Sequence, residues 1–302
     1  MFTKTTSLVI PTRNRYDLLS KVIKQLYDLK IRFNEIIIID SSDKQQRTLI
    51  KSLKKKYNIK LFFSKPSSSL QRNIGIKKSK ARNKLIMFLD DDVIFLKNAF
   101  KKMNNLINKN KNNNEIVGFC FNQVENTKFS LFDQFKKNSL FKKMSLYSDL
   151  PGKLTRSGWH TKILNVKKDT KADWAFTTAS IYKKKMIKNK FFTTTFGKYS
   201  YLEDLEFSLN VTGLNKYFLI SSQAKFKHPL NIDRSNFLFG KIEILNRYKI
   251  IKKYKLNKYL FFLNCFFRFL VSLTKILLLN FNSFLRALGN IKGLMIIMVK
   301  KN

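Results

Sequence analysis

The sequence is poor in the residues that disulfide-stabilised, collagen-like or Pro/Gly-rich proteins require. Its 302 residues include two cysteines, Cys120 and Cys265, which form neither a disulfide framework nor a CxxC pair. With nine glycines and four prolines, the chain is neither collagen-like nor a Pro/Gly-rich disordered segment. The first eight residues are too short and too polar for a cleaved leader. We therefore expect a cytoplasmic protein in a reducing compartment, without structural zinc.

Acidic residues are also scarce. Nineteen Asp and Glu face sixty Lys and Arg, which gives a formal net charge of +41. Such a field attracts nucleic acid, anionic lipid or anionic substrates. Alternatively, the excess of Lys with Asn and Ile, as in residues 102–114, reflects the codon usage of an AT-rich genome. On either interpretation, a cluster of carboxylates is unexpected in this chain and therefore informative.

Apolar runs and helical spacings alternate over the first part of the chain. The runs lack in–out alternation, which predicts an α/β fold with a mostly parallel sheet covered by helices on both faces. We expect strands at Ser7–Ile10 (ended by Pro11), Glu35–Asp40, Ile59–Phe63, Lys84–Leu89 and Ile116–Val124. We expect helices at Asp17–Leu29, Thr48–Tyr57 and Asn98–Asn114, and a polar loop running into a short helix over Ser67–Lys80.

The pattern is weaker in the second part. Residues 125–170 read as long loops with one or two amphipathic segments. Beyond them we expect a strand at Asp173–Tyr182, a helix at Tyr201–Thr212, and short strands at Lys216–Ile220 and Ala224–Phe226. We divide the chain into an α/β domain, residues 1–235, and a C-terminal helical segment, residues 236–302.

The C-terminal segment is rich in Phe and Leu. The run Phe261–Leu279 is long enough to span a bilayer. Arg268 and Lys275 lie inside it, and each costs a few kcal/mol near the centre of a spanning helix. Flanking lysines favour an interfacial helix on an anionic leaflet instead. A helix packed on the α/β domain and a spanning helix remain open alternatives.

The triplet Asp90-Asp91-Asp92 directly follows an apolar strand. Three adjacent carboxylates repel one another unless a cation neutralises them. Mg²⁺ or Mn²⁺ accepts oxygen ligands from one or two carboxylates and completes its shell with phosphate oxygens. The alternative is a solvated acidic turn or a helix start. The strand context and the scarcity of acids favour a metal site that binds a nucleoside diphosphate.

Other polar side chains follow neighbouring strands, where ligands of parallel sheets collect. Asp40 ends the second strand and could accept from a base or ribose, or simply cap a turn. The loop Pro11–Arg15 and the segment Gln71–Asn73 add donors. Each arginine taken alone reads as a surface residue, although Arg is well suited to diphosphates and base edges.

Two features come from the second part of the chain. Glu203-Asp204 opens an amphipathic helix, either as a cap and dipole partner or as a general base. His228 follows a strand and precedes Pro229. A single histidine is usually structural, but beside the carboxylates His228 is a candidate for a third protein ligand of the proposed metal.

In this order, the segments SLVIPTRNR, EIIIIDSSD, SSLQRNIG, KLIMFLDDDVIF and YLEDLEFSLN resemble the family 2 glycosyltransferases. These are inverting enzymes with the GT-A fold, a Rossmann-like, mostly parallel sheet with helices on both faces. The resemblance covers residues 7–125 and, more loosely, residues 173–230. A C-terminal helical tail is expected in addition to that fold.

The resemblance implies roles for individual residues. It implies that Asp204 is the catalytic base, with Glu203 as its neighbour in the pair, and that Asp92 and His228 hold Mg²⁺ or Mn²⁺. It implies that the nucleotide-sugar contacts Pro11, Thr12, Arg13, Arg15, Asp40, Arg72, Asn73, Asp90 and Asp91. The chain departs from the family where Asn210 replaces a common Arg, and where Ala175-Phe176-Thr177 follows Trp174 without the common Gly. Both departures fall in the acceptor half.

The implied function is transfer of a sugar from a nucleoside-diphosphate-sugar, typically a UDP-sugar, to an acceptor hydroxyl. The C-terminal tail suggests a protein bound peripherally to the inner face of the membrane. For such a protein we expect a glycan or lipid-linked acceptor and a role in polysaccharide or glycolipid biosynthesis. A nucleotidyltransferase would share the sheet and carboxylates, but SLVIPTRNR lacks its glycine-rich loop. A nucleic-acid-binding protein fits the charge, but strand-end acids repel phosphates and no recognised motif for specific nucleic acid is present.

Overall fold

The computed structural model describes residues 1–125, 139–197, 200–213, 215–229, 236–276 and 281–299. By its contacts the chain divides into two compact units. The first, Met1–Asn126 with Ile163–Leu230, contains a nine-stranded sheet. The second, Thr127–Lys162 with Asn231–Asn302, contains helices.

One half of the sheet is parallel. Its strands are β1 (Thr6–Thr12), β2 (Glu35–Asp40), β3 (Ile59–Phe63) and β4 (Leu85–Leu89), in the order β3-β2-β1-β4. β1, β2 and β4 are buried along their whole length, which is why they read as unbroken apolar runs. β1 pairs with β2 from Ser7↔Glu35 to Thr12↔Asp40, so both strands end at the same edge.

The other half of the sheet is mixed. It continues through β8 (Ala179–Lys183), β6 (Ile116–Gln123), β9 (Tyr217–Lys227) and β5 (Ile94–Phe95), while β7 (Thr170–Ala172) pairs with β9. β8 runs antiparallel to both β4 and β6, and β9 runs parallel to β6. β6 and β9 therefore share the direction of β4, and their carboxyl ends lie at the same edge as those of β1 and β2. The predicted α/β fold with a mostly parallel sheet is confirmed.

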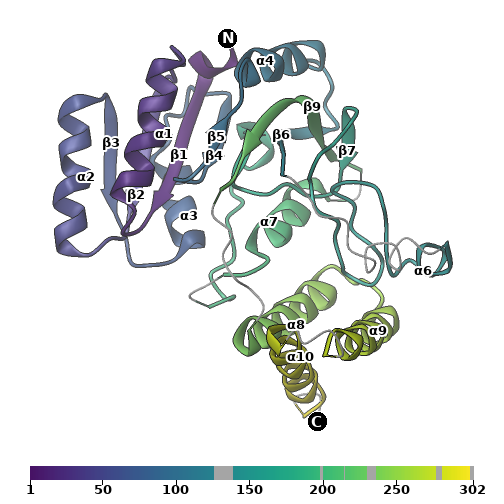
Figure 1. The fold of residues 1–302 in the computed structure, drawn as a ribbon. Helices are drawn as coiled ribbons and strands as arrows, with labels where there is room; N and C mark the ends of the chain where they lie inside the picture. The colour runs from purple at the N-terminus through teal and green to yellow at the C-terminus, as the bar shows by residue number, and fades with distance from the viewer. Residues whose placement is uncertain (126–138, 198–199, 214, 230–235, 277–280, 300–302) are drawn as a thin grey trace. The chain divides into compact units, whose positions relative to one another are not determined.

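Helices surround the sheet (Figure 1). They are α1 (Tyr16–Asp28), α2 (Lys44–Lys56), α3 (Ser68–Lys78), α4 (Ala99–Lys109) and α7 (Glu203–Thr212). Helix α3 packs on β1 and β2, and Gly75 brings it close: a Cβ there would lie 2.3 Å from Cγ1 of Val9. Ser67 caps α3 by accepting from the N–H of Leu70, so the expected polar loop is in fact the start of a helix.

Three strand predictions are wrong in detail. β1 does not end before Pro11 but continues to Thr12. The ladder to β4 covers only Thr6–Val9, so Pro11 lies where β1 has β2 alone as its partner, a position that tolerates a missing N–H. The strand expected at Asp173–Tyr182 is limited to β8. The two short strands predicted after Lys216 form the single strand β9, which carries register shifts against β6.

The second unit contains α6 (Ser139–Lys143), α8 (Phe237–Lys253), α9 (Lys258–Ile276) and α10 (Phe281–Val299). Its core joins Trp159 to Ile244, Tyr248 and Ile251 of α8, Phe261 and Cys265 of α9, and Ile297 of α10. The ring of Trp159 stacks on Phe261 with centroids 5.6 Å apart. The described loop residues 157–159, which the sequence-based division places within residues 1–235, thus pack with the C-terminal helices. The boundary expected at residue 235 lies outside the described residues.

A buried ion-pair network also joins the helices of this unit. Glu243 of α8 accepts from Arg247 at 2.9 Å and pairs with Arg286 of α10 at 2.5 Å. Burial raises the pKa of Glu243, but the charges of Arg247 and Arg286 outweigh burial and hold that pKa below its usual range. Among the helices of the described residues, none combines the length and the apolar character needed to cross a bilayer.

Candidate active site

Most of the predicted site residues lie at or just after the carboxyl ends of β1, β2, β4 and β9, whereas the others lie on two helices, Arg72 and Asn73 on α3 and Glu203 and Asp204 at the start of α7. This edge is where ligands of open α/β sheets bind. Gln71 of α3 ties two of these ends together, because its amide nitrogen donates to the carbonyls of Thr12, at 2.9 Å, and Ile39, at 2.7 Å. The loops that follow β1 and β2 therefore start from strand ends that Gln71 holds together.

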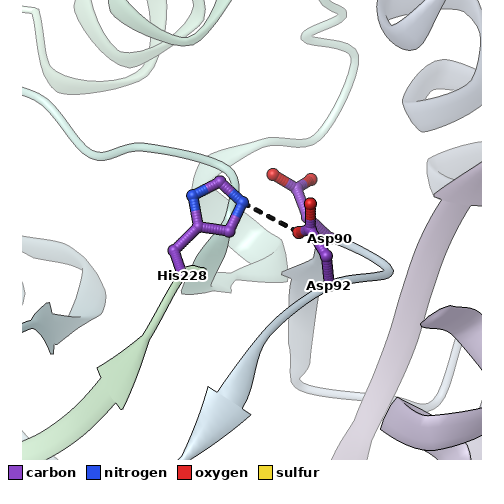
Figure 2. Close-up of side chains that lie close together, drawn as sticks. All are labelled: Asp90, Asp92 and His228. Carbon is purple, nitrogen blue, oxygen red and sulfur yellow. Dashed lines mark hydrogen bonds and ion pairs between the residues drawn. The ribbon is translucent and has the colours of Figure 1, made fainter. Parts of the chain in front are cut away.

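Asp90, Asp92 and His228 form a cluster in which one ligand atom from each residue lies within 4.8 Å of the other two (Figure 2). β5 begins at Ile94, two residues after Asp92, and pairs antiparallel with the end of β9, with Ile94 opposite Lys227. This pairing brings His228, the residue after β9, beside Asp92. Nε2 of His228 lies 2.8 Å from Oδ1 of Asp92.

The chemistry of this cluster fits a divalent cation. Carboxylate oxygens are hard ligands, and an imidazole nitrogen is accepted by Mn²⁺ and its neighbours. The side chains of Asp90 and His228 remain 25% and 23% exposed, so a ligand can reach them. Burial lowers the pKa of His228, but its hydrogen bond to Asp92 and the charges of Asp92 and Asp90 outweigh burial and raise that pKa overall.

Asp91 points to a different set of partners. Its Oδ2 accepts from the hydroxyl of Thr12 at 2.6 Å, and its Oδ1 lies 3.2 Å from the guanidinium of Arg15. Burial raises the pKa of Asp91 to about 6, although Thr12 and Arg15 act in the opposite direction. Arg15 also reaches Oδ2 of Asp92 at 3.1 Å. The middle carboxylate thus fastens the β1 loop to the triplet, and Arg15 is a cation supplied by the protein itself.

Arg72 of α3 connects the triplet to α7. Its guanidinium donates to Oδ1 of Asp90 at 2.9 Å and, through NH1, to Oε1 of Glu203. Glu203 also accepts from the hydroxyls of Ser68, at 2.7 Å, and Ser69. Burial lowers the pKa of Arg72, but the charges of Glu203, Asp90 and Asp204 outweigh burial and raise it. Glu203 is therefore engaged in holding α3 and α7 together.

Asp204 is the more accessible member of the pair. Its side chain is half-buried, and Oδ1 accepts from the N–H of Leu205 at 2.8 Å. Its charge is one of those that raise the pKa of Arg72, after those of Glu203 and Asp90. The backbone N–H of Asp90 donates to the carbonyl of Thr178 at 3.0 Å, so the segment after Trp174 also passes beside the triplet.

Asp40 is fully buried at the end of β2. Its Oδ1 accepts from the N–H of Ser42 at 2.8 Å, whereas Oδ2 accepts no hydrogen bond among the described residues. The nearest cation is Nε of Arg47 at 3.8 Å, and the Arg47 guanidinium also lies over the ring of Phe63, 4.5 Å from its centroid. A buried carboxylate oxygen without a hydrogen-bond donor is suited to receive an N–H from a ligand.

The remaining predicted residues differ in their surroundings. Pro11 is buried in β1, and Arg13 is exposed at the tip of the following loop. Asn73 uses both ends of its amide on the backbone of Phe192, donating to its carbonyl at 2.9 Å and accepting from its N–H at 2.8 Å. This pairing orders the chain segment that faces α3.

Sequence reasoning missed some residues of this site. Arg47 and the serines that hold Glu203 were not singled out, and Gln71 was named as a donor but not as the residue that ties β1 to β2. Arg47 lies in the first turn of the helix that follows Asp40, a position from which a long side chain can return to the strand end. The run Ser67-Ser68-Ser69 before an apolar segment is a signal of a helix start, but nothing in the sequence indicates that two of its hydroxyls bind a glutamate 134 and 135 residues away.

Comparisons with known proteins identify the class. The fold is that of GT-A glycosyltransferases. A TarS fragment from S. aureus superposes with a TM-score of 0.51 at 16% identity, covering 86% of this chain and 71% of that one. The mannosyltransferase PcManGT from Pyrobaculum calidifontis, solved with GDP-Man and Mn²⁺, gives 0.60 at 9% identity, with coverages of 96% and 87%. GalNAc-T7, solved with UDP, GalNAc and Mn²⁺, gives 0.59 at 13% identity, and the match covers 83% of this chain but only 48% of that one.

These identities establish the fold alone, and the family comes from the sequence. The family model described as Glycosyl transferase family 2 matches residues 7–190, more than half of the chain. This protein belongs to that family, as the ordered motifs predicted. No curated protein sequence matches the chain.

Proposed function

We propose that this protein is an inverting glycosyltransferase that moves a sugar from a nucleoside-diphosphate-sugar to an acceptor hydroxyl. The observation that carries the proposal is the cluster of Asp90, Asp92 and His228 at the sheet edge, coupled through Arg72 to the helix that presents Asp204. The cluster can bind the cation and diphosphate of the donor. The helix supplies a carboxylate for the acceptor.

On the donor side, we propose that Asp40 reads the base. Its unsatisfied Oδ2 is suited to an imide N–H such as that of uracil, so a UDP-sugar is our first choice. TarS has been crystallised with UDP-GlcNAc, which supports this choice, whereas PcManGT was crystallised with GDP-Man. Thr12 at the end of β1 and Arg15 on the following loop contact the triplet, and Arg13 lies on the same loop, where arginine side chains suit phosphate oxygens.

Mg²⁺ or Mn²⁺, held by Asp92 and His228 with Asp90 beside them, would neutralise the negative charge of the leaving diphosphate. Asp204 takes the proton of the acceptor hydroxyl as the oxygen attacks the anomeric carbon. The C–O bond to the acceptor forms on the face opposite the departing diphosphate. One displacement therefore inverts the anomeric centre without a protein nucleophile.

On the acceptor side, we propose a glycan or a lipid-linked acceptor, as in the biosynthesis of cell-surface polysaccharide or glycolipid. The chain's own departures from the family, Ala175-Phe176-Thr177 and Asn210, lie at this side. Ser208 of α7 holds Ala175 through its hydroxyl, and Asn210 offers its carbonyl to Lys190 at 2.7 Å. We further propose that the enzyme works peripherally at the cytoplasmic face of the membrane.

The test combines binding and turnover. A thermal-shift screen of nucleoside diphosphates with and without Mn²⁺ should show one nucleotide that stabilises the protein only with the metal. Asp92→Ala should lose this metal-dependent shift. Asp204→Asn should keep the shift but lose sugar transfer and metal-dependent donor hydrolysis. Normal transfer by Asp204→Asn, or the absence of metal-dependent stabilisation by every nucleotide, would contradict the proposal.

A further inference from the structure

Helix α9 has two apolar faces, and one of them is exposed. Phe261 and Cys265 are buried in the core of the helical unit. On the other side, Tyr259, Phe266 and Leu270 are 87%, 55% and 40% exposed. Intervals of seven and four residues place these three side chains in one row along the helix. A row of large apolar side chains in water is costly unless something covers it.

Helix α10 repeats the arrangement. Gly289, Gly293 and Ile297 are buried, at intervals of four residues. The exposed side carries Leu288 at 36%, Met295 at 49% and Val299 at 74%. These intervals of seven and four residues match those of α9, and Lys292 lies within the same row. Two helices of one small unit therefore each expose a long apolar row.

The charges around these rows all have one sign. Among the described residues of α8, α9 and α10, and of the connection between α8 and α9, the acidic side chain is Glu243, which is buried between Arg247 and Arg286. The exposed charged residues are lysines: Lys249, Lys252, Lys253, Lys255, Lys258 and Lys292. Lys258 immediately precedes Tyr259 at the start of the α9 row, and Lys255 lies four residues before Tyr259.

We propose that the rows on α9 and α10 dock onto the surface of an anionic lipid bilayer. Lysines attract the phosphate headgroups, and the apolar rows enter the boundary between headgroups and acyl chains. Tyr259 begins the row with an amphipathic ring of the kind that favours that boundary. This inference deepens the proposed peripheral location by naming the partner's chemistry and the surface that binds it.

The positive charge of this surface favours an anionic bilayer over other binding partners. A second copy would bring two strongly cationic units together and would be repelled, since the chain carries a net charge of +41. A nucleic acid would satisfy the lysines but would leave Leu and Met side chains without an apolar partner. An anionic bilayer complements both the charge and the apolar rows.

The experiment uses the full chain and vesicles of two compositions. Vesicles of phosphatidylcholine with phosphatidylglycerol should bind the protein in sedimentation, and vesicles of phosphatidylcholine alone should bind it far less. Both natural tryptophans, Trp159 and Trp174, are buried, at 7% and 6% exposure, so a new one can report insertion. Tyr259→Trp should shift its emission to shorter wavelength on anionic vesicles and be quenched by brominated acyl chains.

Matched variants separate insertion from general attraction. Leu49 is 42% exposed on the lysine-rich helix α2 of the other unit, so Leu49→Trp should bind but show neither shift nor quenching. Phe266→Ser combined with Leu270→Ser should weaken binding by about ten-fold or more. The control pair Leu29→Ser with Leu49→Ser, each 42% exposed, should leave it unchanged. Lys255→Gln and Lys258→Gln should each cost about five-fold.

Several results overturn the inference. One is the absence of binding to anionic vesicles. A second is binding without a spectral change in Tyr259→Trp. A third is a dimer in light scattering that the Phe266→Ser, Leu270→Ser variant dissolves, and a fourth is RNA binding that depends on the same two side chains. The nucleotide thermal shift of these variants, measured without vesicles, tests the proposed transferase function separately. Failure of either idea is therefore recognisable independently of the other.

Discussion

Arg72 joins Glu203 to Asp90, and thereby links the first residue of α7 to the first residue of the acidic triplet. The guanidinium is buried and both carboxylates accept from it, although 131 residues separate Arg72 from Glu203. The two neighbouring acids of α7 consequently differ in use. Glu203 is turned into the protein and Asp204 is partly open to solvent.

The first prediction concerns this division of labour. Glu203→Gln should lower the free energy of unfolding by about 2 kcal/mol, because it removes a charge that is paired with a buried guanidinium. Asp204→Asn should change stability by less than about 0.5 kcal/mol but lower kcat by about 100-fold or more, because it removes the proposed base. Denaturant unfolding and a transfer assay measure the two effects.

Arg72→Lys provides the control for position. A lysine ammonium cannot reach both carboxylates with the fork geometry of a guanidinium, so this variant should fall between the wild type and Arg72→Met in kcat. If Asp204→Asn proves the less stable protein and Glu203→Gln the less active one, the two roles have been assigned the wrong way round.

Much of the parallel half of the sheet was predictable from sequence because its physics is local. β2 and β3 have the predicted bounds, since each is a short apolar run between polar clusters. The site residues at their ends follow from the same logic, because parallel strands end at one edge. Asp92 and His228, 136 residues apart, were placed in one metal site by family resemblance. The structure shows that the two side chains lie together because β5 pairs with β9, and the metal site itself stays a prediction.

Other features depend on contacts that periodicity does not encode. The serines at the start of α3 resemble a polar loop in the sequence. The pattern does not show that the hydroxyls of Ser68 and Ser69 donate to Glu203 instead of to water. β9 read as two strands because Ser221 and Ser222 interrupt its apolar pattern, although Ser222 is held by Asp169 at 2.8 Å. The association of Trp159 with α8 and α9 could not be predicted, since a single aromatic residue in a loop carries no period.

The second prediction concerns Arg15. Both oxygens of Asp92 already have protein partners, Arg15 at 3.1 Å and His228 at 2.8 Å, so Arg15 would compete with the proposed divalent cation for this carboxylate. Arg15→Gln should tighten Mn²⁺ binding to the free protein by about five-fold, as expected for a half-exposed ion pair worth about 1 kcal/mol. It should weaken binding of the nucleoside diphosphate. Isothermal titration calorimetry measures both affinities.

Arg13→Gln is the matched control, because Arg13 is exposed on the same loop. It should leave the Mn²⁺ affinity of the free protein unchanged. Weaker Mn²⁺ binding in Arg15→Gln would show that Arg15 supports the metal site instead of competing with the cation.

The third prediction concerns pH and Glu35. Glu35 is the first residue of β2, so it lies at the amino ends of the parallel strands, the edge of the sheet opposite the site. Its carboxylate accepts from the hydroxyl of Ser7 at 2.6 Å, from Lys60 at 2.8 Å and from the N–H of Lys80 at 2.6 Å. Burial raises the pKa of Glu35, but the bonds from Lys60, Ser7 and Lys80 outweigh burial and hold that pKa below its usual 4.5. The ionised group therefore stabilises the fold above about pH 4.5, and this contribution is lost as the pH falls through the lowered value.

Glu35→Gln should lower the free energy of unfolding by about 2 kcal/mol at neutral pH. The difference between wild type and variant should shrink as the pH falls below the usual glutamate pKa, because the wild-type carboxylate then becomes protonated too. Urea unfolding at a series of pH values follows this difference. A gap that stays constant with pH would mean that shape, and not charge, is what Glu35 contributes.

The fourth prediction concerns the crossing of α8 and α10 in the helical unit. Gly289 of α10 lies so close to α8 that a Cβ at this position would be 2.0 Å from the carbonyl oxygen of Phe237. A backbone oxygen cannot swing away like a flexible side chain, so Gly289→Ala must separate the helices at a cost of about 3 kcal/mol. Alanine recovers about 1 kcal/mol through its helix propensity. The net loss should be about 2 kcal/mol in denaturant unfolding followed by circular dichroism.

Lys292→Ala, on the exposed side of the same helix, is the control and should stay within about 0.5 kcal/mol of the wild type. An equal or higher stability of Gly289→Ala would show that α10 can shift along α8 without losing packing, because propensity alone predicts that sign.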